Sequence, residues 1–425
     1  KLSNHAPNRE KIGSTNGIWD SLTHIMTEGC DAEKESAIKI LMNLAVHESN
    51  SNEIVKRDKI IKSLFHFMKS ESVNQIRLAT DTLLNLSRHE SNRETIGSTN
   101  GVWESLIHVM TAGCDSGKES AINILMNLVY HESNRKKIVK IDKIIKSLLH
   151  FMKSENVNQR RLATHTLHNL SVNASNIITI GGTDGVWESL IHVMSTVNDN
   201  AKASAAGALH NLSIHVPNRK KIGSTYKIWE SLIHVMNTGN EKAKAAAVSA
   251  IFYLSKHESN NEKIGSTAGI WKALINAMKS VTEREKIAAA GTLMNLACNP
   301  TNREKIGSTV GIWKPLIDGM NKRPEKLAAF SAGALYYFSI HASNSVKIGS
   351  TDDIWTAMID AMKSGTERAK TATAGAFMNL TCSATNREKI ACSEANREKT
   401  VSTDGIYLLL IDIMATGNEH AKVSA

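Results

Sequence analysis

The chain has 425 residues, 41% of them hydrophobic, and carries a net charge of +10 from 51 basic and 41 acidic side chains. This composition is ordinary for a folded chain and excludes collagen and low-complexity disorder. The longest uninterrupted apolar runs, such as 406–411, are far too short to cross a bilayer, so we expect no membrane span. The positive surplus lacks the dense basic block of a nucleic-acid-binding arm.

Five cysteines, an odd number in a long chain, do not have the pattern of a disulfide framework. No charged segment followed by an apolar one opens the chain in the manner of a signal peptide. We therefore expect a reducing, intracellular compartment, and a location that is cytoplasmic or also nuclear.

An internal repeat of 42 residues organises the whole chain. One marker is an Asn, usually followed by Leu, near the end of each apolar segment, at Asn43, Asn85, Asn127, Asn169, Asn211, Asn295 and Asn379, with Tyr253 and Tyr337 at the two remaining positions. A second marker has the same period, at Trp19, Trp103, Trp187, Trp229, Trp271, Trp313 and Trp355, with Ile61 and Ile145 in the gaps. Nine periods without an insertion indicate tandem duplication.

Each repeat is expected to form three helices, as the first one illustrates. Residues 8–12 begin with an Asn of the N-cap type and predict a short first helix. A Gly-Ser-Thr turn then separates it from an amphipathic second helix that starts at 18. A third helix is predicted from 31 to about 46, with Leu41 and Leu44 in its core stripe.

The predicted repeat boundaries follow from this register. The ten repeats lie near 8–49, 50–91, 92–133, 134–175, 176–217, 218–259, 260–301, 302–343, 344–385 and 386–425, with an insertion at 391–400. Both chain ends fall inside a repeat and lack a polar capping unit. We therefore expect either a longer array or ends that pack against something else.

The repeat resembles the armadillo repeat of β-catenin and importin-α. The residues that carry the resemblance are Asn-Arg-Glu-Lys-Ile at 8–12, Gly-Ile at 17–18 and Ala-x-x-x-Leu-x-Asn-Leu at 37–44. Trp stands where many armadillo repeats have Pro after Gly-Ile. The resemblance implies one right-handed, all-α solenoid superhelix over 1–425, in which third helices line a concave groove. In that family an Asn ladder in the groove holds an extended peptide, which assigns the nine Asn and Tyr positions above to peptide binding.

Helix geometry places the residues four, seven and eleven positions before each ladder residue on the same face as that residue. The alternative role of the ladder is structural, with each Asn bonding a neighbouring helix end. At the position four before it, the groove Trp of importin-α is absent. Glycine fills this position in four repeats, at Gly207, Gly291, Gly333 and Gly375. They indicate either close approach of something large or inheritance by duplication.

Charge divides the predicted groove into two halves. Eleven residues before the ladder, the second half of the chain carries Lys242, Arg284, Lys326 and Arg368, whereas the first half carries Ala32, Asn74, Ser116, Asn158 and Asn200. We therefore expect an extended acidic segment whose charged part lies over repeats six to nine. A second column, nine residues before the ladder, is predicted to be solvent-exposed on the opposite side, at Lys34, Lys118, Lys202, Lys244, Lys286 and Lys370.

The other repeated residues are interpreted as structural. Core packing explains the tryptophans better than base stacking does. Histidines in successive repeats lie about 10 Å apart, too far to share a metal ion. No catalytic set emerges, so we expect a non-enzymatic protein-binding scaffold without cofactor or metal. The alternatives are an architectural subunit of a large assembly that uses its convex face and ends, and, third, nucleic-acid binding through the basic surplus.

Overall fold

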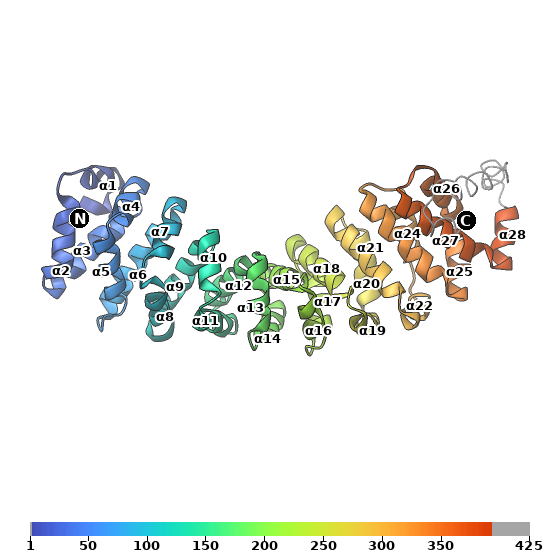
Figure 1. Ribbon diagram of the computed structural model, residues 1–425, viewed down its shortest axis with the longest axis horizontal. Helices are drawn as coiled ribbons and strands as arrows, with labels where there is room; N and C mark the ends of the chain where they lie inside the picture. Colours follow the sequence, from blue (N-terminus) through green and yellow to red (C-terminus); the bar gives the residue numbers. More distant parts are fainter. Residues whose placement is uncertain (1, 393–425) are drawn as a thin grey trace. The chain divides into compact units, whose positions relative to one another are not determined.

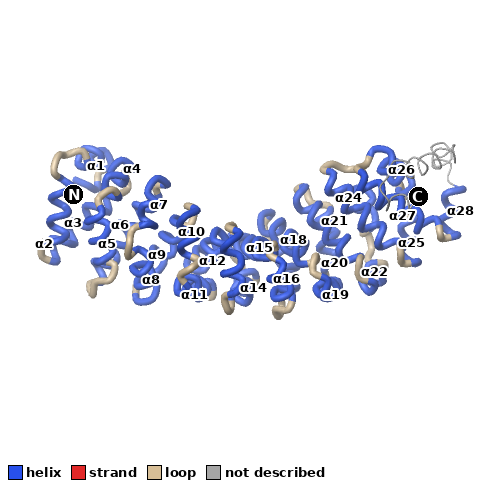
Figure 2. Tube along the Cα trace, in the orientation of Figure 1, coloured by secondary structure: helices blue, strands red, loops and turns tan. Residues whose placement is uncertain are grey.

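The structure, a computed structural model, describes residues 2–392 and is helical throughout this range apart from turns and loops (Figures 1 and 2). It consists of two compact units, one ending at Leu212 and the other beginning at Ser213. Both are built from three-helix repeats, which confirms the predicted all-α solenoid class. The described residues end at 392, so most of the predicted insertion at 391–400 and the part of the last repeat after it lie outside them.

The three helices recur in the same order in every complete repeat. The first helices are α1 (Ala6–Gly13), α4 (Glu48–Val55), α7 (Arg93–Ser98), α10 (Glu132–Ile138), α13 (Ala174–Gly182), α16 (Val216–Gly223), α19 (Glu258–Ser266), α22 (Pro300–Ile306), α25 (Ala342–Gly349) and α28 (Ala384–Cys392). Two short 3-10 turns, η1 (Leu2–Asn4) and η2 (Glu90–Asn92), precede α1 and α7.

The second helices are α2 (Ile18–Glu28), α5 (Asp58–Phe67), α8 (Val102–Ala112), α11 (Asp142–Met152), α14 (Val186–Met194), α17 (Ile228–Thr238), α20 (Ile270–Met278), α23 (Trp313–Met320) and α26 (Ile354–Ser364). The third helices are α3 (Asp31–Leu44), α6 (Val73–Arg88), α9 (Asp115–Leu128), α12 (Val157–Ser171), α15 (Asp199–Ser213), α18 (Glu241–Leu254), α21 (Glu283–Ala297), α24 (Glu325–Ser339) and α27 (Glu367–Thr381).

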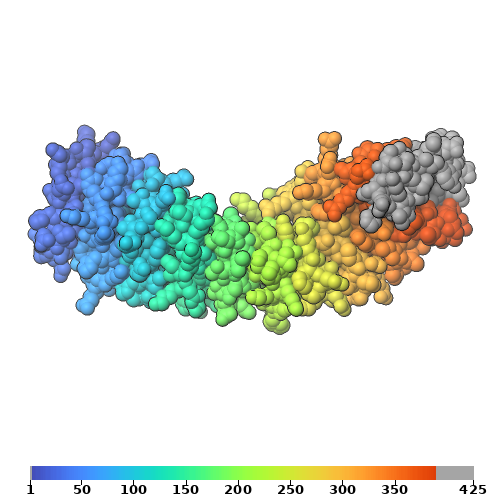
Figure 3. Space-filling model, viewed as in Figure 1, coloured from blue at the N-terminus to red at the C-terminus, as the bar shows by residue number. Residues whose placement is uncertain are grey.

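Like helices stack on like helices within each unit. In the first unit α3, α6, α9 and α12 pack in succession, and in the second unit α18, α21, α24 and α27 do the same. The second helices form a parallel series, and all of them but α14 are seen to pack also on the third helix of their own repeat. Segments within a unit consequently follow one another in sequence order at the surface (Figure 3). This arrangement gives each unit a continuous layer of third helices.

The core lies between the second and third helices. Leu41 and Leu44 are fully buried, as the helical spacing predicts, and Trp19 is 6% exposed. Five of the seven tryptophans are buried and the other two are half-buried, while Ile61 and Ile145 are 1% exposed. The prediction that this register packs in the core is confirmed.

The turn before each second helix explains one recurrent glycine. Gly17 has φ +78° and serves as the N-cap of α2, and Gly101, Gly185 and Gly269 repeat this left-handed geometry. Lys227 and Asp353 adopt it without being glycine. Left-handed φ is strained for most side chains, which explains why glycine is the usual choice here.

Two further predictions concern cysteine pairing and membrane spans. Cys30, Cys114, Cys298 and Cys382 are all unpaired and exposed, which agrees with the absence of a disulfide framework in the sequence pattern. Within the described range, every helix is too short or too polar to cross a membrane.

Candidate binding face

The third helices present the predicted columns at the surface. In α3, Ala32, Ser36 and Lys39 are exposed and Asn43 is half-buried, whereas Leu41 is buried. We call the outward side chains at the ladder position, and four, seven and eleven residues before it, the third-helix face. Because third helices stack on one another within each unit, these side chains form one continuous surface there.

The ladder asparagines donate hydrogen bonds to the preceding third helix. Asn295 Nδ2 donates to Ser255 Oγ at 3.0 Å, and Ser255 Oγ donates to the carbonyl of Phe252 at 2.8 Å. The same relay joins Asn127 to Ser87, Asn211 to Ser171 and Asn379 to Ser339. A neutral hydrogen bond of this kind contributes about 0.5–1.5 kcal/mol. This geometry supports the structural alternative for the ladder.

The hydrogen bond of a ladder asparagine depends on whether a serine stands forty residues earlier. Residue 45 is Ala, so Asn85 donates instead to the carbonyl of Met42 at 3.0 Å. Residue 129 is Val, and the buried Nδ2 of Asn169 has no hydrogen-bond partner among the described residues. An amide has two N–H groups and a carbonyl oxygen, so one donated bond leaves capacity for a peptide. Peptide binding by the ladder stays a prediction.

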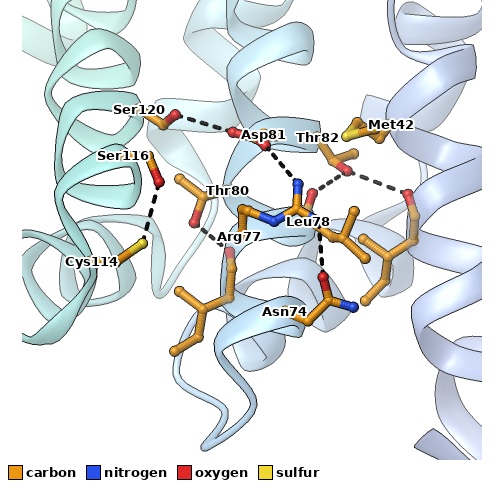
Figure 4. Close-up of polar contacts among 12 residues, drawn as sticks. Met42, Asn74, Arg77, Leu78, Thr80, Asp81, Thr82, Cys114, Ser116 and Ser120 are labelled. Atoms are coloured by element: carbon orange, nitrogen blue, oxygen red, sulfur yellow. Dashed lines mark hydrogen bonds and ion pairs between the residues drawn. The ribbon is translucent and has the colours of Figure 1, made fainter. Parts of the chain in front are cut away.

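In the first unit the middle of the third-helix face is polar and bonded between repeats. Asp81 accepts a hydrogen bond from Ser120 Oγ of the next third helix at 3.1 Å and forms an ion pair with Arg77 at 3.7 Å (Figure 4). One 84-residue period later, His165 Nδ1 lies 3.3 Å from Ser204 Oγ. These contacts occupy the positions where glycine and Ala stand in much of the second unit.

The second unit replaces this polar row with glycines and aromatic rings. A Cβ added to Gly291 would lie 2.4 Å from the ring of Phe252, and one on Gly375 would lie 2.7 Å from the ring of Tyr336. Gly333 meets Met294 in the same way, and near the end of the first unit Gly207 meets His168. Close approach therefore explains the glycines, and what approaches is the large side chain of the preceding third helix.

A half-buried aromatic cluster results on the third-helix face of the second unit. The Phe252 and Phe330 ring centroids are 5.6 Å apart, and Lys256 Nζ lies 4.5 Å from the centroid of Phe252. Burial lowers the pKa of Lys256. Beside it lies a cleft of about 310 Å³, lined in part by Lys256 and Asn295. A ladder residue thus borders a recess that a side chain can enter.

The four predicted basic side chains form an exposed row on the same face. Lys242, Arg284, Lys326 and Arg368 all lie at the second position of their third helices and are exposed. The helix dipole adds positive potential at these N-terminal ends, and the Glu that opens each helix partly offsets it. Within residues 2–392, Lys242 and Lys326 form no ion pair. We call these four residues the basic row.

A second asparagine column, which sequence reasoning misjudged, is fully buried. The expectation that Asn8 caps the first helix is wrong, because His5 is the N-cap and α1 begins at Ala6. In later repeats this asparagine is inside: Asn302 is 0% exposed, and its Nδ2 donates to the carbonyls of Asn261 and Leu296. The column comprises Asn50, Asn92, Asn134, Asn176, Asn218, Asn260, Asn302, Asn344 and Asn386.

Six of the nine buried asparagines pack on a glycine of the preceding repeat, whereas Val55 and Val139 stand at the equivalent position for Asn92 and Asn176. A Cβ on Gly265 would lie 1.9 Å from Asn302 Oδ1, and a Cβ on Gly13 would lie 1.8 Å from Asn50 Oδ1. The same pairing links Gly97 with Asn134, Gly223 with Asn260, Gly307 with Asn344 and Gly349 with Asn386. The Gly of the Gly-Ser-Thr turn is therefore an inter-repeat contact. Its fixed offset from the asparagine, 37 residues, is the sequence signal that could have revealed it.

The predicted solvent-exposed lysine column is not exposed. Lys34, Lys118 and Lys244 are half-buried, and Lys202 is only 5% exposed, with its Nζ 3.4 Å from Asp199. The second helices pack on this side of the third helices and cover the lysine stems there.

Comparison with known proteins shows the fold but no family. No family model matches the chain, and no curated protein matches it. The chain is similar to an engineered protein of known crystal structure, with 18% identity and a TM-score of 0.72, over 89% of this chain and 92% of that one. It is also similar to a chain in a structure concerning the interaction between cadherin and beta-catenin, with 13% identity and a TM-score of 0.76, over 100% of this chain and 87% of that one.

Proposed function

We propose that this chain is a non-enzymatic, armadillo-type scaffold that binds an extended acidic segment of a partner protein on the third-helix face of its second unit. The observation that carries the proposal is the basic row, four exposed cations at one register of consecutive third helices, with a half-buried aromatic cluster on the same face. The likeness to a structure concerning the interaction between cadherin and beta-catenin supports a protein as the partner.

The two rows of the face have distinct tasks in this proposal. The basic row and the ladder are eleven residues apart on a helix that rises 1.5 Å per residue, hence about 16 Å. That is about two Debye lengths at physiological salt, so a strand bound at the ladder would feel the basic row only weakly. The acidic side chains of the ligand therefore lie toward the N-terminal ends of α18, α21, α24 and α27, and its apolar side chains lie on the aromatic cluster.

The attraction is collective rather than local. An exposed ion pair contributes about 0.2–1 kcal/mol, so four of them contribute about 1–4 kcal/mol in total. Consecutive third helices are about 10 Å apart, and an extended chain rises about 3.3 Å per residue. A segment of about twelve residues therefore spans the four helices, and its affinity falls as salt is added.

The test is charge reversal of the basic row in the full chain. The variant K242E/R284E/K326E/R368E should lose binding of a fluorescent glutamate-rich peptide of about twelve residues, measured by anisotropy, with unchanged helical circular dichroism. A control variant of equal charge change, K220E/K221E/K272E/K363E, alters exposed lysines of first and second helices. If both variants lose binding equally, nonspecific charge attraction explains it and the proposed face is wrong.

The architectural and nucleic-acid alternatives give different outcomes. A stoichiometric complex that survives the charge reversal would point to another surface of the chain. Salt-sensitive capture of RNA or DNA in place of the acidic peptide would support the third function.

A further inference from the structure

A crevice recurs on the side of the repeats formed by the second helices. It lies between the end of one second helix, the start of the following third helix and the second helix of the next repeat. In the second unit, equivalent crevices lie beside Met236 and Met278, one repeat apart, and in the first unit another lies beside Met26. Their volumes are about 280, 510 and 320 Å³, so the one beside Met278 is distinctly larger.

In the larger crevice a glycine replaces bulkier residues. Gly319 stands where the equivalent crevices have Ala277 and Phe67. Leu327 replaces Glu285, which makes the floor apolar, and it is only 3% exposed. With Met278 at 6% exposure, the floor is a buried hydrophobic surface. Its volume is in the range of small-molecule sites.

Charge distinguishes this crevice as well. Five basic and two acidic side chains line it, whereas one lysine and two glutamates line the equivalent crevice of the preceding repeat. Lys314 is already engaged, 3.0 Å from Asp318 and 2.9 Å from Asp353. Four further cations have no ion-pair partner within residues 2–392 and surround the apolar floor, namely Lys279, Lys286, Lys322 and Arg323.

We propose that the crevice between α20, α21, α23 and α24 binds an amphipathic anion, a carboxylate or phosphate monoester on an apolar body. The body lies on Met278, Gly319 and Leu327, and the anionic head lies against Lys279, Lys322 and Arg323. Both halves of the recognition are needed, since the exposed cations alone bind weakly and the apolar floor alone does not select charge. The site belongs to the second-helix side and is independent of the third-helix face.

Calorimetric titration of decanoate into the full chain tests the proposal. Decanoate should bind at one site per chain below its micelle concentration. Acetate, which has the head without the body, and decyltrimethylammonium, which has the chain with a cationic head, should bind at least about tenfold more weakly. No decanoate binding, or equal binding of the cationic amphiphile, would overturn the proposal. A phosphate-headed amphiphile, decyl phosphate, compares the two head groups.

Two variants locate the site by restoring residues of the preceding repeat. K279N/K322S/R323V introduces the equivalents Asn237, Ser280 and Val281, and should weaken decanoate binding about tenfold or more. G319A/S331A restores the Ala277 and Ala289 pair. The second change is needed because a Cβ on Gly319 would lie 2.3 Å from Ser331 Oγ. The G319A/S331A variant should also weaken decanoate binding, because the added Cβ narrows the crevice. If both variants keep helical circular dichroism and bind decanoate like the parent chain, the site is elsewhere and the proposal fails.

Discussion

Replacing Gly265 by Ala should show that the buried asparagine column joins successive repeats. Gly265 lies in α19 without a left-handed φ, so an alanine there meets no backbone obstacle. On helix propensity alone the change would stabilise the chain by about 0.5–1 kcal/mol. The obstacle is instead Asn302 of the next repeat, whose Oδ1 lies 1.9 Å and Cγ 2.5 Å from the new Cβ.

The magnitude follows from what Asn302 gives up when it moves. Its Nδ2 donates to the carbonyl of Asn261 at 2.9 Å and to that of Leu296 at 3.1 Å, both in a buried setting. Each bond contributes about 1 kcal/mol, and a carbonyl left buried without a donor costs more, so the total is about 2–4 kcal/mol. G265A should therefore destabilise the contact between α19 and α22 by roughly this amount.

A double-mutant cycle isolates the contact. N302A alone should cost a similar amount, because the same two bonds are lost. In the N302A background the clash is gone, so G265A should become neutral or stabilising. Repeat arrays need not unfold in two states, so the free energy is best measured by native-state hydrogen exchange in α19 and α22.

The matched control is Gly182→Ala, at a helical glycine whose added Cβ would meet nothing within 4 Å. It should be neutral or slightly stabilising in either background. If G265A has the same effect with Asn302 present and absent, then the asparagine is not what excludes a side chain, and the packing argument is refuted.

Three further outcomes are expected. The full chain should give helical circular dichroism and unfold in several steps on urea titration, because each repeat contacts only its neighbours; a substantial strand signal would contradict the fold. N295A and S255A should each lower the stability measured by hydrogen exchange by about 1 kcal/mol. The double variant should lower it by little more than either single one, because the two side chains share one relay. Fully additive losses would show that the two side chains act independently. Burial lowers the pKa of His168 from 6.5 to about 4. As pH falls, His168 therefore takes up a proton in the unfolded chain before it does so in the folded one. The free energy of unfolding should fall by up to about 3 kcal/mol between pH 6.5 and pH 4. H168Q should flatten this dependence in thermal unfolding, and an unchanged slope would exclude His168 as its source.

The sequence by itself determined the period, the helices and the class of fold. A period of 42 residues fixes the repeat, and helical spacing around Leu41, Leu44 and Trp19 selects the buried stripe. The helical spacing is a local property, since it depends on residues within one or two helical turns of each other. The exposed basic row could be predicted in the same way, because its position on the helix face follows from 100° per residue.

Tertiary structure decided which member of each repeated column is buried and what it touches. Asn50 and Asn43 have the same period and the same side chain, yet only Asn50 is fully buried. Lys202 is only 5% exposed despite its charge, and Gly319 lines a crevice together with Met278 of the preceding repeat. These contacts join positions about 34 to 44 residues apart, an offset set by how one repeat rotates and shifts against the next. Repetition shows that such contacts recur, but the stacking geometry decides which residues make them, because burial depends on the neighbouring repeat and not on the helix alone.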